Sequence, residues 1–379
     1  MQKRKFYIIA HNPNTLEEAE EFLRAGANAL EPDVCFDASR PERFYVSHGT
    51  IGSNPFDAEH SLVNYLKGLR AMLSDAARGY NLALIAFDIK SPEFDINEFV
   101  RIVSDNFSDH PVCEGVAILI TVSSLSHISF LNAYDQTRAR VAVGIDQETS
   151  ARDVEAAFMK FGGQRRFTYA NGSIVTDIKF GLFKSIMKAK ALQARRPAES
   201  FRLVYTWVLA RESPIRGFLD LRIDGIIVDV GVVPHLIEIL GDEHFNASYE
   251  IAPNGYNPFD APPVPAYLLT VKTSDARFAG TDVPVKFTLE GAAGTLESTL
   301  ATDFLDVLEH GGTDYVTLEG SDIGEILSLT IAAQTSGLNS EWLPASITLE
   351  SALLPAPLTF TYAPDEWLKL GQPITKTPA

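Results

Sequence analysis

The first two thirds of the chain alternate short apolar runs with amphipathic stretches. Eight apolar runs of strand length occur between residues 5 and 240, and segments with helical periodicity separate them. Near-continuous hydrophobicity is typical of parallel strands that are covered on both faces. Eight strand–helix units in this length predict a TIM barrel, and an open doubly wound sheet is the alternative. The runs are KFYIIA (5–10), NALEPDVCF (28–36), LALIAFDIK (82–90), GVAILITV (115–122), RVAVGI (140–145), RFTYA (166–170), RLVYTWVL (202–209) and DGIIVDV (224–230).

The segment after the first run predicts a helix with recognisable ends. In NTLEEAEEFLRAG (14–26), Asn14 is the expected N-cap, Glu17 takes the capping-box position and Gly26 follows the last turn. Further helices are predicted at SLVNYLKGLRAMLSDAARG (61–79) and SARDVEAAFMKFGG (150–163).

The second apolar run carries two acids on one face. Glu31 and Asp33 are two positions apart, so their side chains point to the same side of a strand. Pro32 between them is tolerated where the strand ladder is ending. The piece RFYVSH (43–48) follows too closely for a crossover connection, so we expect it to return as the second arm of a hairpin. That hairpin brings His48 back toward the two acids.

Polar side chains stand at the carboxyl ends of the predicted strands, which form the active-site face of a TIM barrel. Glu31, Asp33 and Asp88 supply only oxygen atoms, a set that suits a hard divalent cation. Mg²⁺ fits best, because it takes a few carboxylates and keeps water molecules that a phosphate can replace. The polar residues at these ends are His11, Glu31 with Asp33, Asp88 with Lys90, Asp146 and Trp207.

Each of these residues also has a structural interpretation. Asp146 is as readily a helix cap as a site residue, and His48 is also explained as part of a turn. His11 closes a strand, and Trp207 could pack in the core. Three acids, two histidines and a lysine at one end of a barrel make a purely structural explanation of the whole set much weaker.

Composition and charge narrow the classes of partner. The chain has 379 residues, 46% of them hydrophobic, which favours two domains with large cores. A net charge of −17 argues against nucleic acid as a partner and against electrostatic docking on an anionic membrane.

Two cysteines, Cys35 and Cys113, allow at most one disulfide, and the sequence does not decide whether it forms. The chain has no apolar run of 18 residues. The apolar stretch at its start is too short for a signal peptide, so we expect that either the protein is intracellular or a signal has been removed.

The last third changes period. After a segment rich in Pro, Asn and Gly, seven short alternating strands at near-regular spacing predict an antiparallel β-sandwich. The expected domains are a catalytic barrel at 1–240, a linker at 241–264, a sandwich at 265–365 and a tail at 366–379. The seven strands are YLLTVKTSD (267–275), VPVKFTLEG (283–291), TLESTLA (295–301), DYVTLEG (314–320), ILSLTIAAQT (326–335), ASITLES (345–351) and LTFTYAP (358–364).

The motifs IIAHN, GANALEPDVCFD, VSHG, LALIAFDIK, LVYTWV and RIDGIIVDV occur in an order that closely resembles the sphingomyelinase D/phospholipase D family of recluse-spider venoms, actinobacteria and fungi. That family belongs to the glycerophosphodiester phosphodiesterase-like TIM barrels, and the resemblance covers about residues 5–240. It implies that His11 and His48 are the acid–base pair. It also implies that Glu31, Asp33 and Asp88 bind Mg²⁺, that Lys90 contacts the phosphate, and that Trp207 shapes the mouth for a quaternary ammonium headgroup. We place Asp146 with the substrate-binding residues.

The activity implied by the resemblance is headgroup release from a sphingolipid or lysophospholipid, in which a hydroxyl of the substrate attacks the phosphate and a cyclic phosphate forms. A hydrolytic glycerophosphodiester phosphodiesterase is the alternative, and a non-catalytic lipid-binding protein is a further one. The sequence HNP, which begins at His11, and the short path from Asp33 to His48 favour the toxin-like branch. The resemblance also makes secretion the better expectation.

Three stretches depart from the family. HGTIGSNPFD (48–57) lacks the cysteines that bridge this loop in spider members, and VDVGVVPH (228–235) replaces an Asn-Tyr-Pro-Asp motif. In WVLARES (207–213), Leu209 and Ala210 stand where an acid often follows the tryptophan. These changes concern loop geometry and headgroup preference, whereas the metal residues and both histidines are retained.

The last third resembles a PLAT (lipoxygenase homology) domain. The turn AGTD (279–282), Asp322-Ile-Gly and Trp342 stand in the order of that family. The resemblance implies transient contact with a membrane surface, for which Arg277 and Phe278 form a candidate apolar foot. The alternative is that Phe278 packs under its own loop and the domain is a rigid spacer. Ca²⁺ at this domain is an option that no motif in the chain supports.

Overall fold

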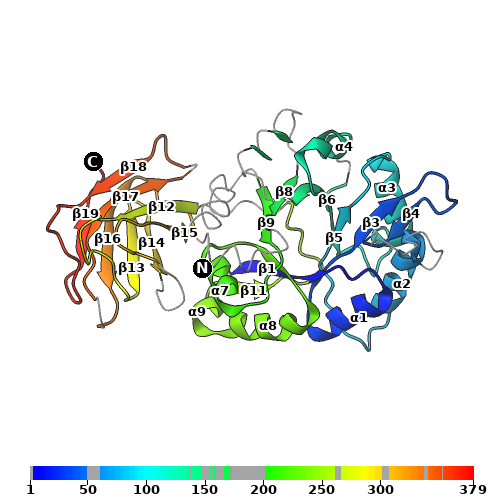
Figure 1. Ribbon diagram of the computed structural model, residues 1–379, viewed down its shortest axis with the longest axis horizontal. Coiled ribbons are helices and arrows are strands. Elements are labelled where there is room, and N and C mark those ends of the chain that lie inside the picture. Colours follow the sequence, from blue (N-terminus) through cyan, green and yellow to red (C-terminus); the bar gives the residue numbers. More distant parts are fainter. Residues whose placement is uncertain are drawn as a thin grey trace.

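A closed eight-stranded parallel barrel forms the first part of the protein (Figure 1). The computed structural model describes residues 3–48, 60–135, 138–146, 153–154, 157–158, 166–170, 172, 201–260, 266–300, 307–336, 340–351 and 353–379. The eight strands pair in parallel around a ring, in which β1 is bonded to both β2 and β10. This closure confirms the TIM barrel and excludes the open sheet. The strands are β1 (Arg4–His11), β2 (Ala29–Glu31), β5 (Leu84–Ile89), β6 (Ala117–Val122), β7 (Val141–Asp146), β8 (Phe167–Ala170), β9 (Phe201–Thr206) and β10 (Gly225–Val228).

Two apolar layers hold the barrel together. Alternate strand residues, such as Ile9, Leu119 and Ile227, fill the barrel interior, and many of their neighbours there are alanines. The opposite strand faces pack against the surrounding helices. The helices are α1 (Leu16–Ala25), α2 (Leu62–Ser74), α3 (Ile96–Val103), α4 (Ile128–Asn132), α7 (Glu212–Asp220), α8 (Val233–Gly241) and α9 (Glu243–Asn246), with short turns η2 (Ser104–Ser108), η3 (Leu125–His127) and η4 (Val230–Val232).

Helix α1 begins one residue later than its sequence pattern indicates. Thr15, not Asn14, is the N-cap, and its hydroxyl accepts a hydrogen bond from the backbone N–H of Glu18, whose carboxylate accepts one in return. The capping box is therefore Thr15 and Glu18, which corrects the predicted pair of Asn14 and Glu17. Asn14 is free to bond elsewhere, and it does so in the site described below. Helix α2 confirms the helix predicted at 61–79, whereas most of the one predicted at 150–163 lies outside the described residues.

The second apolar run forms two strands. Pro32 separates β2 from β3 (Asp33–Phe36), because proline has no N–H with which to continue the ladder. Strand β3 pairs with β5 in a register that sets Asp33 beside Asp88. On its other side β3 pairs antiparallel with β4 (Phe44–Val46), which confirms the expected hairpin.

The lower end of the barrel is closed by residues that were expected to form a linker. Strand β11 (Tyr249–Ile251) adds in parallel to the start of β1. The chain then crosses the barrel floor, where Asn28 donates to the carbonyl of Ala252 at 2.9 Å and Arg140 donates to the carbonyl of Gly255 at 2.7 Å. Phe259 packs in the barrel interior. The barrel unit therefore extends to Asp260 instead of ending near residue 240.

Two four-stranded antiparallel sheets follow and confirm the sandwich (Figure 1). The sheet orders are β15-β12-β17-β18 and β14-β13-β16-β19. The last strand belongs to the segment that was expected to be a tail, and it pairs with β16. The strands are β12 (Ala266–Thr273), β13 (Val285–Gly291), β14 (Gly294–Leu300), β15 (Thr313–Glu319), β16 (Ile326–Ala333), β17 (Pro344–Glu350), β18 (Leu358–Thr361) and β19 (Ile374–Lys376).

The sequence leaves open whether the two cysteines form a disulfide, and the structure answers this question. Cys35 and Cys113 are both buried free thiols, so the structure contains no bridge between them. Burial raises the pKa of the Cys113 thiol to about 12.

Among the helices of the described segments, none combines the length and the hydrophobicity needed to cross a bilayer.

Candidate active site

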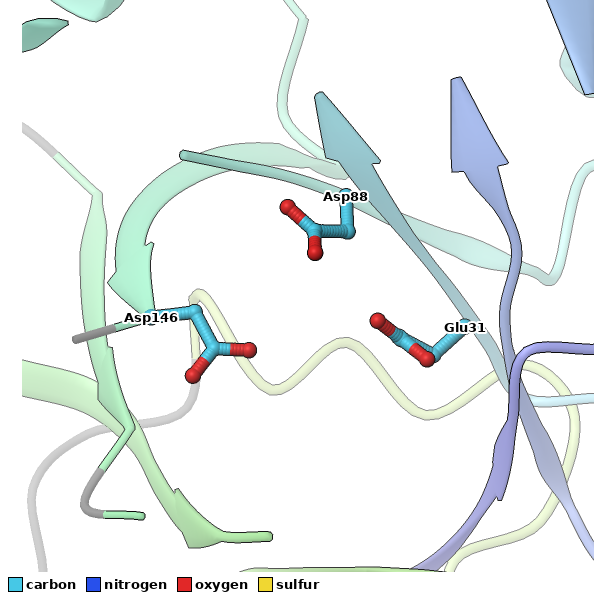
Figure 2. A group of neighbouring side chains, drawn as sticks. All are labelled: Glu31, Asp88 and Asp146. Atoms are coloured by element: carbon cyan, nitrogen blue, oxygen red, sulfur yellow. The ribbon is translucent and has the colours of Figure 1, made fainter. Parts of the chain in front are cut away.

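Three buried carboxylates meet at the carboxyl-terminal mouth of the barrel. Glu31 ends β2, Asp88 lies near the end of β5 and Asp146 ends β7. One oxygen atom of each lies within 4.8 Å of one oxygen of each of the others. Figure 2 shows the three groups pointing toward a common centre from separate strands. Because parallel strands end at the same face of a barrel, the fold itself brings these residues together.

These three acids are held in an environment that opposes their charge. Burial, followed by the nearby carboxylates, raises the pKa of Glu31 and of Asp146 well above the usual range. Burial also raises the pKa of Asp88, although Lys90 acts in the opposite direction. Such shifts arise where negative charges are packed together away from water.

Asp33 has a different environment, although its side chain is also fully buried. Its Oδ2 atom accepts hydrogen bonds from Nδ2 of Asn14 at 3.0 Å and from Nδ1 of His48 at 2.7 Å. Its Oδ1 atom lies 2.8 Å from Nζ of Lys90. Oδ1 of Asp33 makes this ion pair but no hydrogen bond among the described residues, and Asp33 does not belong to the group of three. The sequence had placed Asp33, and not Asp146, with Glu31 and Asp88.

Lys90 connects the two sets of acids. Its ammonium group forms ion pairs with Asp33 and with Asp88. Burial opposes the charge on Lys90, but the two carboxylates outweigh it and raise the pKa of the amine. Lys90 therefore stays positively charged at the mouth, where it is available to a phosphate.

Both histidines are oriented by carboxylates through the same ring atom. Nδ1 of His48 contacts Asp33, and Nδ1 of His11 lies 2.9 Å from Oδ1 of Asp229. In each ring the Nε2 atom is then left for other contacts. A neutral imidazole whose Nδ1 carries the proton presents Nε2 as a base.

The residue after His11 lies between the histidine and the acids. Asn12 has a left-handed backbone, with φ of 51°, and its N–H donates to Oε2 of Glu31 at 3.1 Å. With its amide oriented to satisfy its surroundings, it also donates to Glu31 at 3.3 Å and to Asp33 at 3.2 Å. In this orientation its oxygen accepts a hydrogen bond at 3.3 Å from Nε2 of His11 when that atom carries a proton. Nε2 of His11 therefore faces the acid cluster.

The half-buried Trp207 follows β9 at the same mouth. Burial raises the pKa of Asp146, and Trp207 is among the groups that lower it, which places the indole beside the acid group. Gly172 packs against Trp207 so closely that an added Cβ would lie 2.1 Å from the Trp207 carbonyl oxygen. The buried Tyr205 is also near, because Asp146 contributes, after burial, to the raised pKa of its phenol.

The group of three acids fits a divalent cation. Four carboxyl groups (Glu31, Asp33, Asp88 and Asp146) share a largely buried site with one ammonium, Lys90, which pairs with two of them. Within the described part of the chain, the buried Oδ1 atoms of Asp33, Asp88 and Asp146 have no hydrogen-bond partner. Unpartnered buried carboxylate oxygens are costly unless a cation binds them. Oxygen ligands at this spacing suit Mg²⁺.

All eight residues singled out from the sequence are thus found at the barrel mouth, within one connected set of contacts. Sequence reasoning missed three residues that position them, namely Asn12, Asn14 and Asp229. Asp229 had a usable signal, since it directly follows a barrel strand and the other site acids also lie near the ends of strands. Asn14 had been assigned to the helix cap. The loop 48–57 lies outside the described residues after His48.

Comparison with known protein families gives two matches along the chain. Residues 1–259 match the family described as dermonecrotic toxin SPH, and residues 267–369 match the PLAT/LH2 domain family. The first match covers nearly the whole barrel unit, including the floor that follows β11. The second covers most of the sandwich.

Individual relatives agree with the first match. The chain is similar to the dermonecrotic toxin LvSicTox-alphaIC1aiii of Loxosceles variegata, with 25% identity over 277 residues, which cover 67% of this chain and 98% of the toxin. It is also similar to LruSicTox-alphaIC1c of Loxosceles rufescens, with 26% identity over 278 residues and the same coverage. Among solved structures, a glycerophosphoryl diester phosphodiesterase from Silicibacter pomeroyi matches with 14% identity and a TM-score of 0.40, covering 66% of this chain and 97% of that one.

Proposed function

The chain belongs to the dermonecrotic toxin SPH family, the sphingomyelinase D-like phosphodiesterases, and from this premise we propose that it is a Mg²⁺-dependent phospholipase D of this type. Its proposed substrate is a sphingolipid or a lysophospholipid, from which it releases the alcohol of the headgroup. The observation that carries the proposal is the arrangement at the barrel mouth. Two carboxylate-bound histidines and a lysine surround a buried acid group that fits a divalent cation.

The proposed reaction uses the two histidines as base and acid. Nε2 of His11 removes the proton from a free hydroxyl of the substrate, and that oxygen forms a bond to phosphorus. The bond between phosphorus and the headgroup oxygen breaks, and His48 donates a proton to the departing alcohol. The products are a cyclic phosphate and a free alcohol such as choline or ethanolamine. An internal hydroxyl gains from proximity, since no second molecule has to be positioned.

Glu31, Asp88 and Asp146 would hold the Mg²⁺ ion. When bound, the ion supplies positive charge that stabilises the phosphate oxygens as negative charge develops on them. Lys90 adds a second positive charge from the side of Asp33 and Asp88. Trp207 offers an aromatic face beside Asp146, and a quaternary ammonium headgroup can stack on it.

The sandwich is proposed to bring the barrel to a lipid surface for short periods. Phe278 is 71% exposed on the loop after β12, with the guanidinium of Arg277 4.7 Å from the centre of its ring. A large aromatic side chain exposed to this degree supports the membrane-foot interpretation over a loop packed on itself.

Phosphorus NMR tests the proposal. The purified protein with Mg²⁺ is given sphingomyelin, ceramide phosphoethanolamine, lysophosphatidylcholine and, separately, glycerophosphocholine. We expect a cyclic phosphate from at least one lipid, lost with a chelator and in His11→Ala. His244→Ala is the matched control, because His244 also pairs with an aspartate, Asp220 at 2.9 Å, but on the outer helices.

Three outcomes would contradict the proposal in different ways. A linear monophosphate from glycerophosphocholine alone would identify a hydrolytic glycerophosphodiester phosphodiesterase. A product that survives in His11→Ala would remove the assigned base. If no substrate gives a product and calorimetry shows no Mg²⁺ binding, the result would favour a non-catalytic lipid-binding protein.

A further inference from the structure

Thr168 carries a buried hydroxyl group in the barrel interior. The residue lies in β8 and is fully buried. Its neighbours Phe167 and Tyr169 belong to the outer apolar layer, so the Thr168 side chain faces inward, because side chains alternate along a strand. Among the described residues, its Oγ1 atom has no hydrogen-bond partner. A valine would fill the same space without burying a polar atom, so a threonine at this position indicates that the hydroxyl binds something other than these residues.

Strand register places this hydroxyl below one of the three acids. β7 and β8 pair in parallel, with Gly144 opposite Thr168 and Asp146 opposite Ala170. Gly144 and Asp146 face the same side of β7, since they are two positions apart, and roughly 6.5 Å separates them along the strand. The Thr168 Oγ1 atom lies over Gly144, because an added Cβ on that glycine would be only 2.1 Å from it. The hydroxyl is therefore directed at β7, one strand repeat below the Asp146 carboxylate.

The gap between the Thr168 hydroxyl and the Asp146 carboxylate suits a water molecule. A separation of one strand repeat is too long for a direct hydrogen bond, but two hydrogen bonds through one water can span it. Oδ1 of Asp146 likewise lacks a hydrogen-bond partner within the described segments. The side chains in the interior are small, among them Ala86, Ala142 and Ala170. Buried waters are found where polar groups without protein partners line the interior.

The water would supply a contact that the other two proposed ligands already have. Glu31 accepts a hydrogen bond from the N–H of Asn12 at 3.1 Å, and Asp88 pairs with Lys90, so a protein group orients each of them. For Asp146 the corresponding contact at Oδ1 would come from the water. A carboxylate offers about four positions that accept a bond, so Asp146 can bind a cation and a water at the same time.

We propose that the barrel interior binds one water molecule between the Thr168 hydroxyl and Oδ1 of Asp146, and that Thr168 is thereby a positioning residue for the Asp146 carboxylate. The inference rests on the proposed function for its link to Mg²⁺, and it deepens that function by extending the site one layer into the barrel. Partners of ligating carboxylates orient them and increase metal affinity. Thr168 therefore affects Mg²⁺ binding without contacting the ion or the substrate.

Three variants separate this role from packing alone. Thr168→Val keeps the shape of the side chain and removes the hydroxyl, whereas Thr168→Ser keeps the hydroxyl and removes a methyl group. Thr317→Val is the matched control, because Thr317 is also a buried strand threonine, in β15. Its Oγ1 atom, too, has no hydrogen-bond partner among the described residues, but it belongs to the sandwich and not to the acid group.

The first measurements are calorimetric titration with Mg²⁺ and thermal unfolding without metal. We expect Thr168→Val to raise the Mg²⁺ dissociation constant roughly tenfold, and Thr168→Ser to restore it to within about threefold of wild type. Thr168→Val should also lower the unfolding temperature, because the water and Asp146 lose a partner. Thr317→Val should leave Mg²⁺ binding unchanged and keep or raise the unfolding temperature, because it removes a buried polar atom that has no partner.

The second measurement locates the water directly. Crystal structures of the metal-free wild type and of Thr168→Val should show density for a water between Thr168 and Asp146 in the first and none in the second. Absence of this density in the wild type would overturn the proposal. So would a Thr168→Val variant that binds Mg²⁺ as tightly as the wild type and, like Thr317→Val, unfolds at the same or a higher temperature.

Two further outcomes remain decisive. If Thr168→Val does not fold, the density in the wild type decides whether the water is bound. If the wild type binds no Mg²⁺, the proposed function fails, while the density and the metal-free unfolding still decide whether Thr168 and Asp146 share a water.

Discussion

The four buried carboxylates at the barrel mouth differ in what surrounds their oxygen atoms. Oδ2 of Asp33 is hydrogen-bonded by Asn14 and His48, and its Oδ1 atom makes an ion pair with Lys90. Among the described residues, the Oδ1 atoms of Asp33, Asp88 and Asp146 have no hydrogen-bond partner. A cation that binds Glu31, Asp88 and Asp146 breaks fewer existing contacts than one that binds Asp33. The geometry therefore separates metal binding from the orientation of His48.

Asp146→Asn and Asp33→Asn test that separation. We expect Asp146→Asn to weaken Mg²⁺ binding by roughly tenfold or more, because a charged ligand is lost. Asp33→Asn should weaken Mg²⁺ binding less while it lowers kcat, since it disturbs His48 and Lys90. Isothermal titration calorimetry and kinetics measure the two effects. A larger loss of Mg²⁺ affinity in Asp33→Asn than in Asp146→Asn would show that Asp33 is the ligand, as its place in the sequence suggested.

Gly172 controls the position of Trp207. A methyl group at Gly172 would lie 2.1 Å from the Trp207 carbonyl oxygen, so Gly172→Ala must push the tryptophan segment away. We expect a loss of about 1–3 kcal/mol of stability, typical of overpacking, together with reduced activity. Thermal unfolding, kinetics and tryptophan fluorescence check this. Gly231→Ala is the control, because nothing lies within 4 Å of its added Cβ. Equal behaviour of the two variants would show that the contact is not restrictive.

At the scale of elements, the strands of both domains could be predicted, because the hydrophobic pattern of each strand is contained in its own few residues. The site residues were predictable for a related reason, since parallel strands end at one face and polar residues stand out there. The short strands β11 and β19 were not predictable, because only three residues of each pair with a distant strand. Asp229 was missed because the sequence around it was interpreted only as a departure from a family motif.

The side chain of Asn28 makes three hydrogen bonds to backbone groups at the barrel floor. Its Oδ1 accepts from the N–H of Ile8 at 2.7 Å, and its amide donates to the carbonyls of Phe6 at 3.1 Å and Ala252 at 2.9 Å. The residue is almost fully buried, so water cannot replace these bonds. Sequence analysis did not single it out, since an asparagine at the start of a strand carries no special signal.

Asn28→Ala should lower the free energy of unfolding by about 2–4 kcal/mol, because it leaves several buried backbone groups unpaired. Urea unfolding followed by circular dichroism measures the loss. Asn97→Ala is the control: its amide also bonds the backbone, at Ala133 and Asp135, but in a solvent-exposed position. A loss no larger than that of Asn97→Ala would mean that the floor contributes little to stability.

At the scale of the whole molecule, the net negative charge opposes binding to an anionic membrane, whereas the exposed apolar side chains favour binding to a membrane. A net charge of −17 repels an anionic bilayer, so we expect binding to depend on apolar contacts and to be stronger on zwitterionic lipid. Phe278 follows the end of β12, and Leu353 follows the end of β17, which is antiparallel to β12. The two exposed side chains therefore belong to opposite ends of the sandwich.

Phe278→Ser should weaken binding to zwitterionic vesicles roughly tenfold, since it removes one large side chain that can be buried in lipid. Activity on a micellar or soluble substrate should be unchanged. Vesicle sedimentation and parallel assays on the two substrate forms give the comparison. Leu353→Ser is the control, because Leu353 is also exposed but belongs to the other end. If both variants bind vesicles equally, the loop after β12 is not the contact.

The floor of the barrel has a consequence for how such proteins arise. The spider toxins correspond over 98% of their length to about two thirds of this chain, and the barrel seals its own lower end by Asp260. The next unit begins at Ala266, where β12 starts. A gene fusion between these two positions cuts through neither unit. The boundary between the two units is therefore a position at which a sandwich can be joined to a barrel without interrupting a strand of either.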